Sequence, residues 1–252
     1  MERVLAARTA GAPIIGEILL VEHDPVVTIS NRAGAEGNLL VPRDLLAQRG
    51  ISVEPTDRGG DITYHGPGQI VVYPILDLNR LNLGLHDYMR LLEQSVMDAC
   101  TALGVPTTRD PGATGVWTVR PNLSVSALGV SSEASGASVP PGLESVRGLA
   151  LSPASQPLAQ APLQPHAKIA AMGVRVRRWI STHGLALNVR TDLSHFGVIV
   201  PCGLVGRPVT SLSAELGDAC PPTGDVARVL IERLSALIVQ ADAEAVRKRA
   251  NA

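Results

Sequence analysis

Aromatic side chains are scarce in this chain of 252 residues, where two Trp, three Tyr and one Phe make up 2% of the composition. Glycine and proline are plentiful by comparison, with 24 and 19 residues. The chain is nevertheless 45% apolar. Either its core is built from Val, Leu, Ile and Ala, or part of the chain is not core at all.

The chain also lacks a surplus of charge, because 22 basic side chains face 23 acidic ones and the formal net charge is −1. Phosphate binding draws on clustered Lys and Arg, so this balance argues against nucleic acid as the main partner. The basic stretch at Arg175, Arg177 and Arg178 is short.

Long apolar runs are missing too. No run approaches the roughly 20 residues that a membrane-spanning helix needs, and the first residues lack the layout of a secretion signal. We therefore expect a cytoplasmic protein with no membrane partner.

The three cysteines fit neither a disulfide framework nor a paired zinc site, and the six histidines show no HxxxH or HExxH spacing. We expect no metal and no cofactor.

Residues 121–165 differ in composition from the rest of the chain. They hold nine Ser, seven Pro, seven Ala and four Gly, but only three charged side chains and no aromatic one. Such a segment cannot bury enough surface to offset its ordering entropy. We predict a flexible, low-complexity insert at 121–165 within a single domain that spans residues 1–252.

Apolar runs before the insert predict strands at Ile18–Glu22, Pro25–Ile29 and Gln69–Leu78. Pro74, inside the last of these, suggests a bulge or an edge position. After the insert, we expect strands at Val174–Ile180 and Leu185–Val189, separated by a Ser-Thr-His-Gly turn.

Helices are predicted at Leu85–Leu103, with Cys100 on the buried face, and at Val226–Val239, with Asp225 as the N-cap. Strands that alternate with helices, together with strand pairs too close to hold a helix between them, predict an α/β fold. We expect a mixed sheet with helices packed on it.

The densest unusual stretch is RGGDITYHGPGQ, Arg58–Gln69, in which four glycines and five polar side chains precede a buried strand. Glycines at this density let a backbone approach a ligand closely. A plain turn is the alternative, but a turn does not need Arg, Asp, Thr, Tyr and His among its glycines. The spacings of a P-loop and of a dinucleotide fingerprint are both absent. The stretch therefore indicates binding or catalysis.

A second cluster, Ile199–Gly206, places Cys202 between Pro and Gly just after an apolar run. A thiol attacks as its thiolate, which a nearby cation or base favours, and the candidates are Lys168, Arg58, His65 and His183. Lys168 is one of very few lysines and lies in a small, apolar setting, AKIAAMG. An ammonium held there would favour the thiolate, and desolvation would favour release of its proton. Taken singly, a structural cysteine and an ordinary surface lysine remain equally good interpretations.

A third stretch, His183–Val189, brings small residues into a predicted strand. It suits the wall of an apolar tunnel, although a simple sheet strand is the alternative. Cys100 and Cys220 are both interpreted as structural.

Together these stretches resemble the lipoyl(octanoyl) transferase family. The resemblance covers most of Leu19 to Leu212 in the family's order and rests on Arg58–Gln69, Lys168–Val176 (KIAAMGVRV), His183–Val189 (HGLALNV), Pro201-Cys202-Gly203 and Val209–Leu212 (VTSL). It implies the fold of the biotinyl/lipoyl protein ligases, a mixed sheet flanked by helices.

Two features depart from the family's pattern. Only about 18 residues precede Leu19, where a strand and a helix are usual, so we expect the first strand to be missing or the start codon to be misassigned. Residues 121–165 stand where the family has a much shorter loop.

The resemblance implies transfer of an octanoyl or lipoyl group from acyl carrier protein to a lysine of a lipoyl domain, through a thioester on the enzyme. It implies that Cys202 is the nucleophile and that Lys168 activates the thiol and shuttles protons. The substrate-binding residues it implies are Arg58, Gly59, Gly60, Asp61, Ile62, Thr63, Tyr64, His65, Ala171, Met172, Gly173, Gly184, Leu185 and Ala186.

The partners that the resemblance implies are octanoyl-acyl carrier protein as donor and two kinds of acceptor: the lipoyl domains of 2-oxoacid dehydrogenase complexes and the glycine-cleavage H protein. We expect a monomer. Two alternatives stay open. An ATP-dependent lipoate or biotin ligase of the same fold would need an adenylate-binding loop and would not need Cys202. A non-catalytic acyl-carrier-binding relative would be inactivated by the short N-terminus.

Overall fold

The computed structural model describes residues 1–12, 14–119 and 165–251. The predicted insert at 121–165 lies outside these residues, except that Pro165 is the first residue of strand β8 (Pro165–Arg177). The described residues on either side of the gap fold together as one unit.

Six strands form the larger sheet in the order β1-β5-β9-β8-β7-β6, and every neighbouring pair is antiparallel. Strands β5 and β9 are mostly buried, as the apolar run at Gln69–Leu78 predicts. The bounds are Gly16–Val21 (β1), Gln69–Leu76 (β5), Thr107–Asp110 (β6), Ala113–Val119 (β7), Pro165–Arg177 (β8) and Ile180–Asn188 (β9).

A second sheet has the order β3-β2-β4. Its strands are Ser52–Thr56 (β3), Val26–Ser30 (β2) and Ile62–His65 (β4). Strand β2 is parallel to β3 and antiparallel to β4, so the mixed pairing lies in this smaller sheet. The predicted α/β fold, with sheet and flanking helices, is confirmed.

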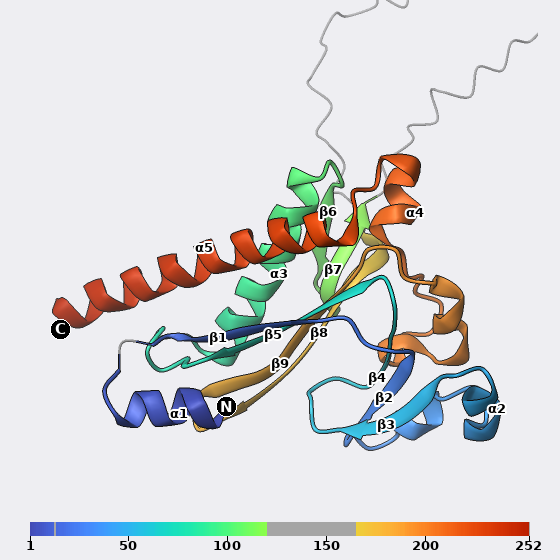
Figure 1. The fold of residues 1–252 in the computed structure, drawn as a ribbon, viewed down its shortest axis with the longest axis horizontal. Helices are drawn as coiled ribbons and strands as arrows, with labels where there is room; N and C mark the ends of the chain where they lie inside the picture. The colour runs from blue at the N-terminus through green and yellow to red at the C-terminus, as the bar shows by residue number, and fades with distance from the viewer. Residues whose placement is uncertain (13, 120–164, 252) are drawn as a thin grey trace, which may run out of the picture. The chain divides into compact units, whose positions relative to one another are not determined.

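Two long helices build the main core with the larger sheet. Helix α3 (Leu85–Ala102) packs on the sheet, and α5 (Thr223–Ala250) packs on α3 (Figure 1). Leu92, Val96 and Cys100 are buried there, as the apolar periodicity predicts, whereas Leu85 at the first position is exposed. No helix within the described part of the chain is long and apolar enough to cross a membrane.

The remaining helical segments are short. They are α1 (Glu2–Thr9), α2 (Arg43–Gln48), α4 (Leu212–Leu216) and the 3-10 turns η1 (Ala35–Asn38), η3 (Leu193–Val198), η4 (Pro201–Gly203) and η5 (Gly217–Ala219). A second core joins the smaller sheet to η3, with Val27, Ile62 and Tyr64 packed near Phe196.

The turn between β8 and β9 lies at Arg178-Trp179, so the predicted turn at 181–184 is wrong. Arg178 and Trp179 have φ values of 53° and 61°, the combination of a two-residue type I′ hairpin. Such turns favour Asn and Gly, so an Arg-Trp pair gives no turn signal. Gly184 lies inside β9, where a Cβ atom would come within 2.1 Å of the Val72 carbonyl oxygen. Glycine at that position permits the close approach of β9 to β5.

Pro74 is not at a sheet edge, because β5 lies between β1 and β9. The register of β5 with β9 ends at Val72. Beyond it, the Ser181 hydroxyl donates to the Pro74 carbonyl and accepts from the Leu76 N–H. The regular pairing of β5 with β9 therefore ends before Pro74, so the N–H that proline lacks is not needed for that pairing.

The start and the end of the last predicted helix are also wrong. Helix α5 begins at Thr223 after Pro222, so Asp225 is its third residue and not its N-cap. A carboxylate in the first turn still interacts favourably with the helix dipole. The helix continues to Ala250 because its buried positions continue to Ala245.

Replacing Gly184 by Ala should lower the free energy of unfolding by about 1–3 kcal/mol, the usual cost of overpacking. The added methyl group would collide with the β5 backbone. Gly224→Ala is the matched control, because nothing lies within 4 Å of its Cβ position and a helix favours Ala. Denaturant unfolding compares the two variants, and equal stability would contradict the predicted clash.

Candidate active site

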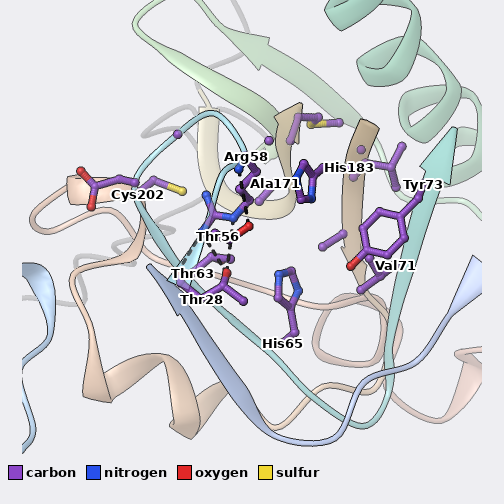
Figure 2. A pocket seen from close by; sticks show the side chains of 17 residues that line it. Thr28, Thr56, Arg58, Thr63, His65, Val71, Tyr73, Ala171, His183 and Cys202 are labelled. Atoms are coloured by element: carbon purple, nitrogen blue, oxygen red, sulfur yellow. Dashed lines mark hydrogen bonds between the residues drawn. The ribbon is translucent and has the colours of Figure 1, made fainter. Parts of the chain in front are cut away.

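A pocket lies between the two sheets, with walls from β2 and β4 on one side and from β5, β8 and β9 on the other (Figure 2). It encloses about 560 Å³ including its open mouth. The predicted residues that line it are Arg58, Gly60, Asp61, Thr63, His65, Ala171, Met172, Gly173, Gly184, Leu185, Ala186 and Cys202. The fold thus gathers four separate sequence motifs around one space.

Strand geometry decides which residues of the glycine-rich stretch reach this pocket. Side chains alternate along β4, so Thr63 and His65 line the pocket while Ile62 and Tyr64 pack in the second core. Gly59 does not line the pocket either; its N–H donates to the Val174 carbonyl at 2.9 Å. The structure therefore does not bring Gly59, Ile62 or Tyr64 to the site.

Arg58 places a positive charge on the pocket wall. Its Nη2 donates to the carbonyl oxygen and to Oγ1 of Thr28, at 2.9 and 3.0 Å. Burial lowers the pKa of Arg58 below its usual range, but a guanidinium does not lose its proton in a protein. The side chain is thus fixed to β2 as a permanent cation.

Cys202 lies at the centre of the short turn η4, with a φ of 56° that non-glycine residues rarely adopt. Asn38 fastens this turn to the glycine-rich stretch. Its carbonyl accepts from the Val200 N–H at 2.8 Å, and its side-chain amide donates to Asp61 Oδ1 at 2.7 Å. Asp61 is buried, so Asn38 connects the turn that carries Cys202 to a buried side chain.

Lys168 on β8 is only 7% exposed, and its Nζ lies 3.5 Å from Cys202 Sγ. The ring of Trp117 is 4.9 Å from the same nitrogen. No carboxylate of the described residues lies within ion-pair distance of Nζ. A buried ammonium normally needs a charged or strongly polar partner. The geometry thus sets a buried amino group beside the Cys202 sulfur.

A smaller cavity adjoins the pocket at Cys202. Lys168, Asn188 and Val209 line this cavity alone, whereas Thr63, Ala171, Ala186 and Cys202 line both spaces. Ala171 and Ala186 have small side chains, which leave room in the passage where the two spaces meet.

A line of buried hydrogen bonds connects the sequence motifs. His65 Nδ1 lies 2.7 Å from Gln69 Oε1, Gln69 Nε2 donates to Asn188 Oδ1 at 2.9 Å, and Asn188 Nδ2 donates to the Thr210 carbonyl at 3.0 Å. The Thr210 N–H in turn donates to the Lys168 carbonyl at 2.9 Å. Because the Gln69 oxygen accepts, His65 Nδ1 carries the hydrogen. Burial lowers the pKa of His65 to about 4, so the ring is neutral near pH 7.

Several lining residues are absent from the sequence-based prediction: Thr28, Thr56, Val71 and Tyr73. His183, expected only as a candidate base, lines the pocket beside them, and burial lowers its pKa. Period-two alternation from Gln69 would have marked Val71 and Tyr73 as sharing a face. Thr28 and Thr56 carry no such signal, because they reach the pocket through the pairing of β2 with β3 and β4.

Residues 1–235 match the family model described as the lipoyl protein ligase A/B catalytic domain. The octanoyltransferase of Koribacter versatilis is 41% identical over 202 residues, which cover 79% of this chain and 63% of that protein. The octanoyltransferases of Geobacter metallireducens and Chloroflexus aggregans are 37% and 39% identical to this chain. Each alignment covers 94% of this chain, and they cover 86% and 87% of the two relatives, respectively.

Solved structures share the fold at low identity. A bipartite lipoate protein ligase from Thermoplasma acidophilum has a TM-score of 0.58 at 16% identity, over 93% of this chain and 80% of that one. Lipoate-protein ligase A bound with ATP has a TM-score of 0.56 at 17% identity, over 92% of this chain and 79% of that one.

The buried neutral His65 predicts a pH dependence of stability. Its pKa is about 4 in the folded protein and near 6.5 unfolded, so the unfolded chain binds more protons between these values. This contribution, about 3 kcal/mol in full, is present above pH 6.5 and is lost as the pH falls toward 4. Unfolding of wild type and His65→Asn across this range measures it. The variant should lose that part of the slope, and identical slopes would contradict the prediction.

Proposed function

The chain belongs to the lipoyl protein ligase A/B catalytic domain family, and we propose that it transfers octanoyl groups by way of a thioester on Cys202. Its resemblance to the lipoyl(octanoyl) transferases is confirmed by octanoyltransferases at 37–41% identity. The activity is that of an acyltransferase of protein lipoylation. The observation that supports the thioester route is the 3.5 Å contact between Lys168 Nζ and Cys202 Sγ.

In the first transfer, the Cys202 sulfur attacks the carbonyl carbon of the donor thioester. The bond from that carbon to the donor sulfur breaks, and the donor leaves as a thiol after taking up a proton. The Lys168 ammonium stabilises negative charge on either sulfur and supplies the proton. One thioester replaces another, so the step is nearly balanced in free energy.

In the second transfer, the ε-amino group of an acceptor lysine attacks the Cys202 thioester. An amide bond forms, the carbon–sulfur bond breaks, and the Cys202 sulfur leaves as its thiolate. Lys168, left as an amine by the first transfer, accepts the proton that the acceptor amine loses. Because an amide is more stable than a thioester, this step makes the transfer irreversible.

The acyl chain occupies the pocket that opens from Cys202. Ala171 and Ala186 lie at the passage, and Val71 and Leu185 supply apolar wall farther along. Figure 2 places Cys202 and Tyr73 at opposite ends of the pocket, with Arg58 between them. Each methylene buried there contributes about 0.8 kcal/mol, so the depth of the apolar wall selects chain length.

The donor in this proposal is octanoyl-acyl carrier protein. The acceptors are lipoyl domains, those of 2-oxoacid dehydrogenase complexes and the glycine-cleavage H protein. At family level, an acyl donor and a lipoyl-domain acceptor are the partners. Nothing favours the non-catalytic alternative, since the predicted nucleophile and its cation lie in hydrogen-bond contact. The likeness to ATP-dependent ligases is one of fold.

Octanoylation of the enzyme tests the route directly. Wild type mixed with octanoyl-acyl carrier protein should gain one octanoyl group by intact mass, and hydroxylamine should remove it as it removes a thioester. Cys202→Ser should lose the hydroxylamine-sensitive adduct, and Lys168→Met should form it about 100-fold more slowly, the usual size of an acid–base contribution. Cys220→Ser is the control and should label like wild type. A sensitive adduct on Cys202→Ser would exclude Cys202 as nucleophile.

A larger side chain on the apolar wall farther from Cys202 should shorten the acyl chain that the enzyme accepts. Val71→Phe should lower kcat/KM for an octanoyl donor by about tenfold, because two displaced methylenes are worth about 1.6 kcal/mol. A butyryl donor should lose much less. Steady-state rates with both donors measure the ratio, and equal losses would contradict this placement of the chain.

A further inference from the structure

The β8–β9 hairpin is unusual in its charge. Residues 165–188 contain Lys168 and three arginines but no Asp or Glu, in a chain with slightly more acidic than basic side chains. Lys168 is buried, so the exposed charge is carried by Arg175, Arg177 and Arg178 at the outer half of the hairpin. We call Arg175–Trp179 the hairpin tip.

The hairpin tip continues the pocket along one strand face. Ala171 and Gly173 line the pocket, and residues two positions apart on a strand share a face. Arg175 and Arg177 are the next positions on that face. At about 3.3 Å per residue, Arg177 lies about 13 Å beyond Gly173. These two arginines therefore continue the strand face that lines the pocket.

The three arginines of the hairpin tip differ in their partners. Arg175 pairs with Asp57, whose other carboxylate oxygen is 2.7 Å from Nε2 of the pocket-lining His183. This contact ties the base of the tip to the rim of the pocket. Neither Arg177 nor Arg178 has an ion-pair partner among the residues that the structure describes. Their charges remain available to a ligand.

The turn itself carries an exposed aromatic residue under strain. Trp179 is 51% exposed and has a φ of 61°, a conformation that bulky side chains rarely adopt. The Arg8 side chain of α1 donates to the Arg178 carbonyl at 2.9 Å and braces the turn in this form. Exposed Trp beside Arg is a composition typical of binding hot spots. About half of this apolar residue is left in solvent, where a partner can cover it.

We propose that the hairpin tip is the docking surface for the acidic carrier protein that delivers the acyl group. This inference rests on the proposed function. A carrier protein presents its thioester at the end of a long, flexible, phosphate-linked arm, so the carrier itself docks at a distance from Cys202. Carboxylates of the carrier pair with Arg177 and Arg178, and the arm reaches Cys202 from outside the pocket that the acyl chain fills. An acceptor lysine has only four methylenes, so a lipoyl domain must dock directly at the Cys202 end.

Charge reversal at the tip tests this proposal. The full chain carrying Arg177→Glu and Arg178→Glu is compared with wild type for octanoylation of Cys202 from two donors. One donor is octanoyl-acyl carrier protein, and the other is octanoyl-N-acetylcysteamine, a small neutral thioester with no carrier. With the carrier donor, kcat/KM should fall about tenfold or more while kcat changes little, because steering and docking are lost. With the small donor, the rates should match.

A matched control has the same net charge as the tip variant but carries its two charge reversals on another element. Arg233→Glu with Arg247→Glu reverses two exposed arginines of α5 and should leave both donors unaffected. Added salt should slow the wild-type reaction with the carrier and have little effect on the tip variant.

Three results would overturn the proposal: equal rates for tip variant and wild type with the carrier, equal losses with both donors, or a loss confined to the transfer from preloaded enzyme to a lipoyl domain. The last result would assign the tip to the acceptor. Failure of the proposed function itself is distinguishable, because then the small donor would not label wild-type Cys202 at all.

Discussion

The site depends on the burial of one amino group beside one sulfur. Lys168 is withdrawn from water on β8, and within the described residues its side-chain partners are the Cys202 thiol and the face of Trp117. Burying an ammonium without a carboxylate is costly unless another group supplies negative charge, or unless the proton can leave. In the proposed acyl transfer, an ammonium at this position favours a nucleophilic sulfur, and an amine provides a base.

The backbone around this pair explains why separate motifs are needed. Strand β8 holds Lys168, and the segment after Cys202 pairs with it through the Pro208 carbonyl and the Thr210 N–H. Gln69 and Asn188 connect that segment to His65, so the glycine-rich stretch and β9 are part of the same frame. Each buried amide in the line would cost free energy if its partner were removed. The chemistry of two residues therefore depends on a polar framework drawn from four parts of the chain.

Much of this was predictable from residues whose signal is local. The apolar run of β5, the period of α3 and the burial of Cys100 all follow from short-range patterns, and Lys168 was notable as a lysine among small apolar residues. The β8–β9 turn was not predictable, because Arg178 and Trp179 adopt a conformation that their types disfavour while Gly184 serves strand packing. Predicting that Ile62 and Tyr64 point away from the pocket into the second core required the β4 register, and predicting the position of Thr28 required the pairing of β2. Sequence reasoning found the motifs, and tertiary pairing decided which face of each one is used.

A crystal structure of the octanoyl-loaded enzyme tests the central claim most directly. The account predicts continuous density from Cys202 Sγ along the passage between Ala171 and Ala186, with Lys168 Nζ within hydrogen-bond distance of the thioester. It also predicts that the Gln69–Asn188 line stays intact in the loaded state. Density for the acyl group on another side chain, or a Lys168 side chain turned out to solvent, would contradict it.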